Sequence, residues 1–87
     1  MTHVVVYVTR ICSYCTHVKR LLGSKGIRFE EVDVSNDLER RRWLVAASGQ
    51  RTVPQVFVDG RPYGGFTDLL ALEHQGKLDA ILGLTPD

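Results

Sequence analysis

Apolar residues recur along the first part of the chain with two different spacings. Residues 3–8, HVVVYV, are almost continuously apolar and β-branched, which predicts a strand buried on both faces of a sheet. Apolar positions then repeat at helical spacing over residues 13–22, and Gly23 and Gly26 supply stop signals. Cys12 therefore precedes the N-terminus of a predicted helix.

The next segment combines a second strand with a second helix. Residues 27–34 read as a strand whose alternation changes phase at Glu30 and Glu31, which indicates a bulge at that point. Three residues of helix-capping type follow, and they precede a predicted helix over residues 38–48 that ends at Gly49.

A hairpin is predicted in the second half of the chain. Residues 55–58 and 61–63 flank Asp59-Gly60, a dipeptide that suits a tight turn between two short antiparallel strands. Pro62 has no amide donor, so we expect the second of these strands at an edge of the sheet.

The remaining residues read as helices and complete a β-α-β-α-β-β-α order. Thr67 can cap a helix over residues 68–75, and a short helix over residues 77–82 follows. A strand-helix-strand unit favours a right-handed crossover, which makes the first two strands parallel. The fold class is α/β, and with no repeat or linker we expect a single domain over residues 1–87. Ligands of such sheets bind at the carboxyl ends of strands, where Cys12 lies.

Composition narrows the function classes. The chain has 87 residues, 44% of them hydrophobic and 24% charged, with a net charge of +1, as in an ordinary soluble globular domain. A net charge this close to zero lacks the strong positive charge that is typical of nucleic-acid-binding domains. No apolar run approaches the roughly 18 to 20 residues of a membrane span, and the first residues show no export signal. We therefore expect a protein of the reducing cytoplasm.

Cys12 and Cys15 are the only cysteines of the chain. A bridge between them closes a very short loop and contributes little stability, and in a reducing compartment such a pair is more often catalytic, redox-sensing or metal-binding. At a helix entrance the Cys12 thiolate is favoured, so its pKa should fall below the usual value of about 8.5. Arg10 could add positive charge. Cys15 lies one turn inward, where it could resolve a mixed disulfide at Cys12.

Two other interpretations of the pair stay open. One is an inert couple without chemistry, and the other is a zinc site. Structural zinc needs four ligands, and the histidines available to complete it, His3, His17 and His74, show no pair spacing. We expect all three to be surface histidines. The run Arg40-Arg41-Arg42 lies in the second predicted helix and is expected mainly on a solvated face.

Three segments, YVTRICSYCTHVKRLL, GQRTVPQVFVDGRPYGG and GGFTDL, together resemble the glutaredoxin family, in order and spacing, over nearly all of the chain. The resemblance implies a thioredoxin fold, that is, a small mixed four-stranded sheet flanked by helices. It also implies the use of glutathione, with Cys12 as the attacking thiol and Cys15 as the resolving thiol.

The resemblance further implies a glutathione site. Its expected residues are Arg10, Tyr14, Arg41, Thr52, Val53, Pro54, Gly65, Thr67 and Asp68. The family's cis-proline loop would be Thr52-Val53-Pro54, with the Val53 backbone pairing to the glutathione peptide. Asp68 and the helix start after Gly65 would receive the γ-glutamyl end, and Arg41 would receive the glycine carboxylate. Thr9 stands where many members carry a lysine, and Arg10 next to it is the candidate replacement.

The leading hypothesis is a glutathione-dependent thiol-disulfide oxidoreductase that reduces protein disulfides and glutathione mixed disulfides. Its partners would be glutathione, disulfide-bonded or glutathionylated proteins and, indirectly, glutathione reductase. It would act as a monomer without a metal.

Two alternatives stay open. Ser13 stands where many members carry proline, and some members with this variant assemble a [2Fe-2S] cluster between two protomers, using the first cysteine of each and two glutathione thiols. Such a protein would be a cluster-bridged dimer ligated through Cys12. The other alternative is a thioredoxin-like reductant recycled by a flavoprotein reductase.

Overall fold

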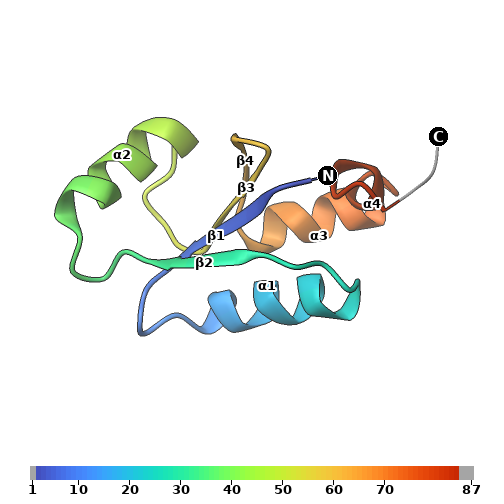
Figure 1. Ribbon diagram of the computed structural model, residues 1–87, viewed down its shortest axis with the longest axis horizontal. Helices are drawn as coiled ribbons and strands as arrows, with labels where there is room; N and C mark the ends of the chain where they lie inside the picture. Colours follow the sequence, from blue (N-terminus) through green and yellow to red (C-terminus); the bar gives the residue numbers. More distant parts are fainter. Residues whose placement is uncertain (1, 85–87) are drawn as a thin grey trace.

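A four-stranded sheet with helices on both faces organises residues 2–84, the part of the chain that the computed structural model describes (Figure 1). Residues 1 and 85–87 of the expected domain lie outside the described residues. The elements are, in chain order, β1 (Val4–Val8), α1 (Ser13–Ser24), β2 (Glu30–Asp33), α2 (Leu38–Ser48), β3 (Gln55–Val58), β4 (Arg61–Gly64), α3 (Phe66–His74) and α4 (Leu78–Ile81).

The strands lie in the order β2-β1-β3-β4. β1 is parallel to β2 and antiparallel to β3, and β3 is antiparallel to β4. The predicted parallel first pair and the mixed sheet are therefore confirmed, as is the position of Pro62 on an edge strand. Asp59 and Gly60 have φ values of 51° and 82° in the hairpin turn, as a turn of this kind requires.

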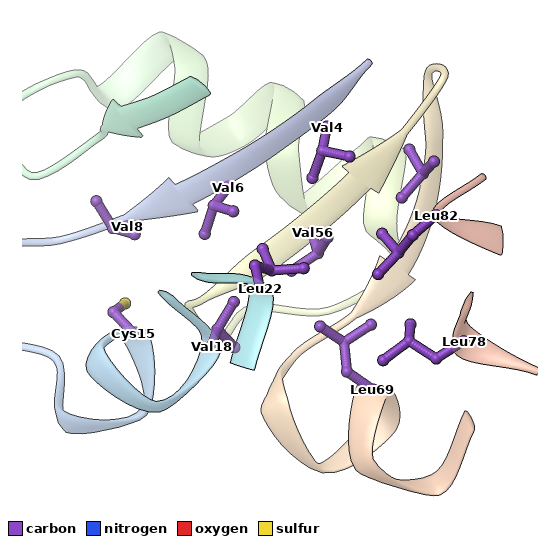
Figure 2. Packing of buried hydrophobic residues seen from close by; sticks show 11 residues of the cluster. Val4, Val6, Val8, Cys15, Val18, Leu22, Val56, Leu69, Leu78 and Leu82 are labelled. Carbon is purple, nitrogen blue, oxygen red and sulfur yellow. The ribbon is translucent and has the colours of Figure 1, made fainter. Parts of the chain in front are cut away.

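One face of the sheet carries the larger hydrophobic core. Helices α1, α3 and α4 cover this face (Figure 1). Figure 2 shows the residues that fill the layer between the sheet and these helices, among them Val4, Val6, Val8, Cys15, Val18, Leu22, Val56, Leu69, Leu78 and Leu82. Burial of this apolar area is the main favourable term in the folding free energy.

Among the helices of residues 2–84, only α2 covers the opposite face (Figure 1). Leu44 of α2 packs against Phe57, and the Tyr7 ring lies 5.5 Å from that of Trp43 and 5.3 Å from that of Phe57, centroid to centroid. Tyr7 and Val5 are only partly buried, and Trp43 is 47% exposed. The expectation that β1 is buried on both faces is therefore wrong for this face, because one helix covers only part of it.

Two local expectations also differ from the structure. β2 begins at Glu30 and pairs with β1 in continuous register, so no bulge lies at the two glutamates. As an edge strand it exposes both of them, and no burial pattern constrains their alternation. The register shift lies instead between Val56 and Phe57, where β3 pairs with β4.

The ends of two helices differ from expectation as well. α1 continues through Gly23 to Ser24, because the residue that adopts a left-handed φ, 71°, is Gly26. α3 begins at Phe66, with Gly65 as its N-cap, so Thr67 lies inside the first turn and does not cap it.

The corner between β4 and α3 depends on Gly64. Its φ is +90°, and a Cβ at this position would overlap the carboxylate of Asp68. That carboxylate accepts a hydrogen bond from the Gly65 N–H at 2.9 Å. The glycine therefore allows the backbone to approach the side chain that holds the start of α3.

Lys25 joins the ends of three helices. It follows α1, and its Nζ lies 2.6 Å from Oδ1 of Asp79 and 2.7 Å from Oε2 of Glu73, on α4 and α3. The hydrogen bonds from Lys25 to Asp79 and then to Glu73 raise the pKa of Lys25 above its usual 10.5. The charged lysine is thus favoured in the folded state.

Replacing Lys25 with methionine should lower the melting temperature at neutral pH, because two carboxylates lose their cation. A raised folded-state pKa stabilises the protein fully below the unfolded value of 10.5, and this contribution disappears as the pH rises through the folded value. The gap between native protein and Lys25→Met should therefore narrow above pH 10.5. The control is Lys77→Met, which should leave the melting temperature nearly unchanged, because Lys77 is exposed and forms no ion pair within residues 2–84. Equal melting temperatures at neutral pH would contradict this role.

Gly64→Ala should destabilise the protein by about 2 to 4 kcal/mol, from left-handed strain and overlap with Asp68. The matched control is Gly23→Ala, because Gly23 lies in α1 and a Cβ there meets nothing within 4 Å. That change should be neutral or stabilise by up to about 1 kcal/mol. Urea unfolding measures both, and a similar effect of the two substitutions would contradict the account of the corner.

Candidate active site

Cys12 is the N-cap residue of α1. Its backbone is extended, with φ −157°, and its Sγ accepts a hydrogen bond from the Cys15 N–H at 3.1 Å. The two cysteines form a disulfide, with their Cα atoms 5.3 Å apart. Cys15 is 3% exposed and belongs to the main core, whereas Cys12 is half-buried. The predicted position of Cys12 at the helix entrance and of Cys15 one turn inward is confirmed.

The loop that carries Cys12 is held by the loop that follows β2. The Arg10 N–H donates to the Ser35 hydroxyl at 2.8 Å, and the Ser35 N–H donates to Oδ1 of Asp33 at 2.8 Å. Hydrogen bonds from Ser35 lower the pKa of the Asp33 carboxyl. Asp37, not Ser35, caps α2, accepting from the Arg40 N–H at 3.0 Å. Ser35 therefore fixes the course of the chain just before the reactive pair.

A groove of about 440 Å³ is lined by Tyr14, the residue between Ser13 and Cys15 of the cysteine motif, although neither cysteine is in its wall. The Val53–Pro54 peptide bond in this groove is cis. Seven of the nine residues expected to bind glutathione line it: Tyr14, Thr52, Val53, Pro54, Gly65, Thr67 and Asp68. The structure thus brings together three segments that lie far apart in the sequence.

Arg10 and Arg41, the other two expected residues, do not line this groove. They line a separate hollow of about 400 Å³ together with Ile11 and the loop before α2. The expected set is therefore divided between two depressions that share no lining residue.

Three residues of the site were not expected from the sequence. Gln50 and Phe66 line the groove, and the Phe66 ring stacks on that of Tyr14 with centroids 6.1 Å apart. Gln55 is fully buried, and its Nε2 donates to Oε1 of Gln50 at 2.8 Å and to the Thr52 carbonyl at 2.9 Å. The signal for Gln55 was a polar residue opening the otherwise apolar strand QVFV, since buried polar groups are hydrogen-bonded.

The histidines His3, His17 and His74 are all exposed, as expected. Among residues 2–84, no three side chains of histidine, cysteine, aspartate or glutamate lie close enough to hold a metal ion. Within the same residues, every helix is too short or too polar to cross a membrane.

The profile of the glutaredoxin family matches residues 4–62. Glutaredoxin 3 of Escherichia coli K12 is 40% identical over 82 residues, which cover 94% of this chain and 99% of that protein. The solution structure of glutaredoxin from Brucella melitensis superposes with a TM-score of 0.85 at 42% identity, over 97% of this chain and 91% of that one.

The crystal structure of the buckwheat glutaredoxin-glutathione complex superposes with a TM-score of 0.86 at 30% identity, over 94% of this chain and 77% of that one. These overlaps confirm the predicted thioredoxin fold. With the helix-capping cysteine, its buried partner and the groove lined by Tyr14, they show that the chain belongs to the glutaredoxin family of thiol-disulfide oxidoreductases.

Proposed function

We propose that this protein reduces glutathione mixed disulfides and protein disulfides with glutathione as the reductant. The observation that carries the proposal is that Tyr14, from the motif that contains the Cys12–Cys15 pair, lines the 440 Å³ groove. A solved relative with 30% identity binds glutathione. The groove also provides peptide backbone, a helix start and a carboxylate, which suit a small zwitterionic peptide.

The reaction requires two exchanges at the sulfur of Cys12. The Cys12 thiolate attacks the glutathione sulfur of a mixed disulfide, the old S–S bond breaks, and the substrate thiolate leaves and takes up a proton. The glutathionyl group is then bonded to Cys12. A glutathione thiolate then attacks the sulfur of the bound glutathionyl group, the bond to Cys12 breaks, and the products are the Cys12 thiolate and glutathione disulfide.

The internal thiol offers a second route. Cys15 lies within bonding distance of Cys12, as the disulfide shows, so its thiolate can attack the Cys12 sulfur and expel glutathione. A protein disulfide is reduced in the same way, with a substrate cysteine in place of glutathione. Two glutathione molecules then restore the dithiol.

The groove suggests how glutathione is oriented. Oδ2 of Asp68 already accepts from the Gly65 N–H, and we assign its Oδ1 to the γ-glutamyl ammonium. The amides at the start of α3, near Thr67, receive the γ-glutamyl carboxylate. The Val53 backbone pairs with the glutathione peptide beside Thr52 and Pro54, and Tyr14 borders the sulfur.

The hollow lined by Arg10 and Arg41 contributes charge for the other end of glutathione. Arg41 lies at its edge with Arg10, and we assign Arg41 to the glycine carboxylate. Arg10 adds positive charge near the Cys12 thiolate. We further propose that the protein acts as a monomer in a reducing cytoplasm and that glutathione reductase recycles the disulfide product.

A dimer bridged by a glutathione-ligated [2Fe-2S] cluster would use the Cys12 sulfur as a ligand to iron. Cysteine thiolate suits cluster iron, but ligation by Cys12 requires the Cys12–Cys15 bond to be open. The disulfide supports Cys15 as a resolving thiol, a role that cluster ligation does not need, whereas both the first exchange and cluster ligation start from the reduced pair. Visible absorbance after anaerobic reconstitution with iron, sulfide and glutathione distinguishes the two.

The proposed function predicts different consequences for the two cysteines. Cys12→Ser should lower the rate of reduction of a small glutathione mixed disulfide at least about a thousandfold, because the nucleophile is lost. Cys15→Ser should keep a substantial rate, because free glutathione can release Cys12. The assay couples the product, glutathione disulfide, to glutathione reductase.

Two outcomes contradict the proposal. If the native protein and both variants are inert, catalysis of this kind is wrong and cluster binding becomes the better hypothesis. If Cys12→Ser stays active while Cys15→Ser is inert, the roles of the two thiols are reversed.

A further inference from the structure

Four arginines surround the hollows next to the reactive pair. Arg10 and Arg41 line the hollow that contains Ile11. Arg41 also lines a second hollow, of about 370 Å³, with Arg42 and Arg51. Because Arg41 belongs to both, the hollows adjoin. We call the side chains of Arg10, Arg41, Arg42 and Arg51 the arginine surface.

None of the four arginines forms an ion pair within residues 2–84, although the charge of Arg10 also acts on the Asp33 carboxyl. Within residues 2–84, the ion pairs use His3, Lys19, Lys25 and Arg40 as their cations. Arg40, from the same run as Arg41, pairs with Asp37 at 3.8 Å and lines the depression on the opposite side of α2, with Trp43. A chain with a net charge of only +1 therefore concentrates positive charge at one place.

Apolar side chains lie among these arginines. Ile11, the residue before Cys12, is 97% exposed, and Val45, which shares the second hollow, is 36% exposed. Leu38, 65% exposed, lies three and four residues before Arg41 and Arg42 on α2 and so borders the same side of the helix. Exposed apolar groups next to unpaired charge are typical of a protein-binding surface. Nucleic acid would use the charge but not the aliphatic side chains.

We propose that the arginine surface selects the disulfide substrates of the proposed function, on which this inference rests. The preferred substrates are glutathionylated proteins whose modified cysteine is flanked by aspartate or glutamate and by an aliphatic residue. The acidic side chains contact Arg42 and Arg51, and the aliphatic residue contacts Ile11 or Val45. Such complementary charge acts mainly on the rate of association and on the choice of partner.

The test compares two peptides that differ only in charge. Each carries one glutathionylated cysteine, flanked by a leucine and by four glutamates in one peptide and four lysines in the other. At low ionic strength the native protein should show a kcat/KM about tenfold higher for the acidic peptide. Added salt at about 0.5 M should remove most of this preference, since exposed charges are screened.

The variants Arg42→Gln and Arg51→Gln, combined in one protein, should reduce the preference to about twofold or less. Neither residue belongs to the proposed glutathione site, so the rate with a small, uncharged glutathione mixed disulfide should stay unchanged. The matched control combines Arg20→Gln with Arg28→Gln, two exposed arginines outside both hollows. It should keep the native preference.

Equal kcat/KM values for the two peptides, with normal activity on the small disulfide, would overturn this inference and leave the proposed function intact. A native protein inactive on the small disulfide would overturn both. A single-stranded DNA oligonucleotide that binds more tightly than the acidic peptide, and loses binding in the Arg42→Gln, Arg51→Gln variant, would assign the surface to nucleic acid instead.

Discussion

The N-cap position of α1 is the point on which the chemistry of this protein depends. Helices usually begin with serine, threonine, aspartate or asparagine at this position, and here a cysteine sulfur accepts the hydrogen bond from the first turn. A thiolate accepts such a bond better than a thiol, and the helix dipole adds to the effect. One sulfur therefore both caps the helix and becomes the nucleophile, so the fold itself favours the reactive form.

The rest of the sheet keeps that sulfur in place and surrounds it. Buried Val8 ends β1 just before the reactive loop, Ser35 holds the loop by a hydrogen bond, and buried Cys15 fixes the first turn of α1 in the core. On the other side, the amide of Gln55 ties Gln50 and Thr52 together beneath the groove. Loops at one end of the sheet thus form a site, while rigid strands and helices determine their positions.

The sequence predicted those features that depend on local chemistry. The cysteine pair at a helix entrance, the Asp59-Gly60 turn and Gly49 at the end of α2 each have a short-range physical cause, and the structure contains all three. The groove residues were predicted only through resemblance to a family, because nothing local connects Tyr14 with Asp68.

The features that could not be predicted depend on how elements cover one another. Tyr7 is apolar enough for a fully buried strand, yet α2 leaves it partly exposed. Arg41 and Arg42 adjoin Arg51 only in the folded chain, since the sequence shows just an arginine run on a helix. The role of Gln55 depends on its two hydrogen-bond acceptors, Gln50 and Thr52, which lie in the loop before β3 and come close to it only in the folded chain.

The most direct test of the central claim is a pH titration of the reduced protein, following the ultraviolet absorbance of the thiolate. We expect one thiolate to form well below the ordinary cysteine pKa of about 8.5, and we expect this transition to be absent in Cys12→Ser and present in Cys15→Ser. Two thiols that both titrate near or above about 8.5 would contradict this expectation, because the start of α1 would then not stabilise the Cys12 thiolate.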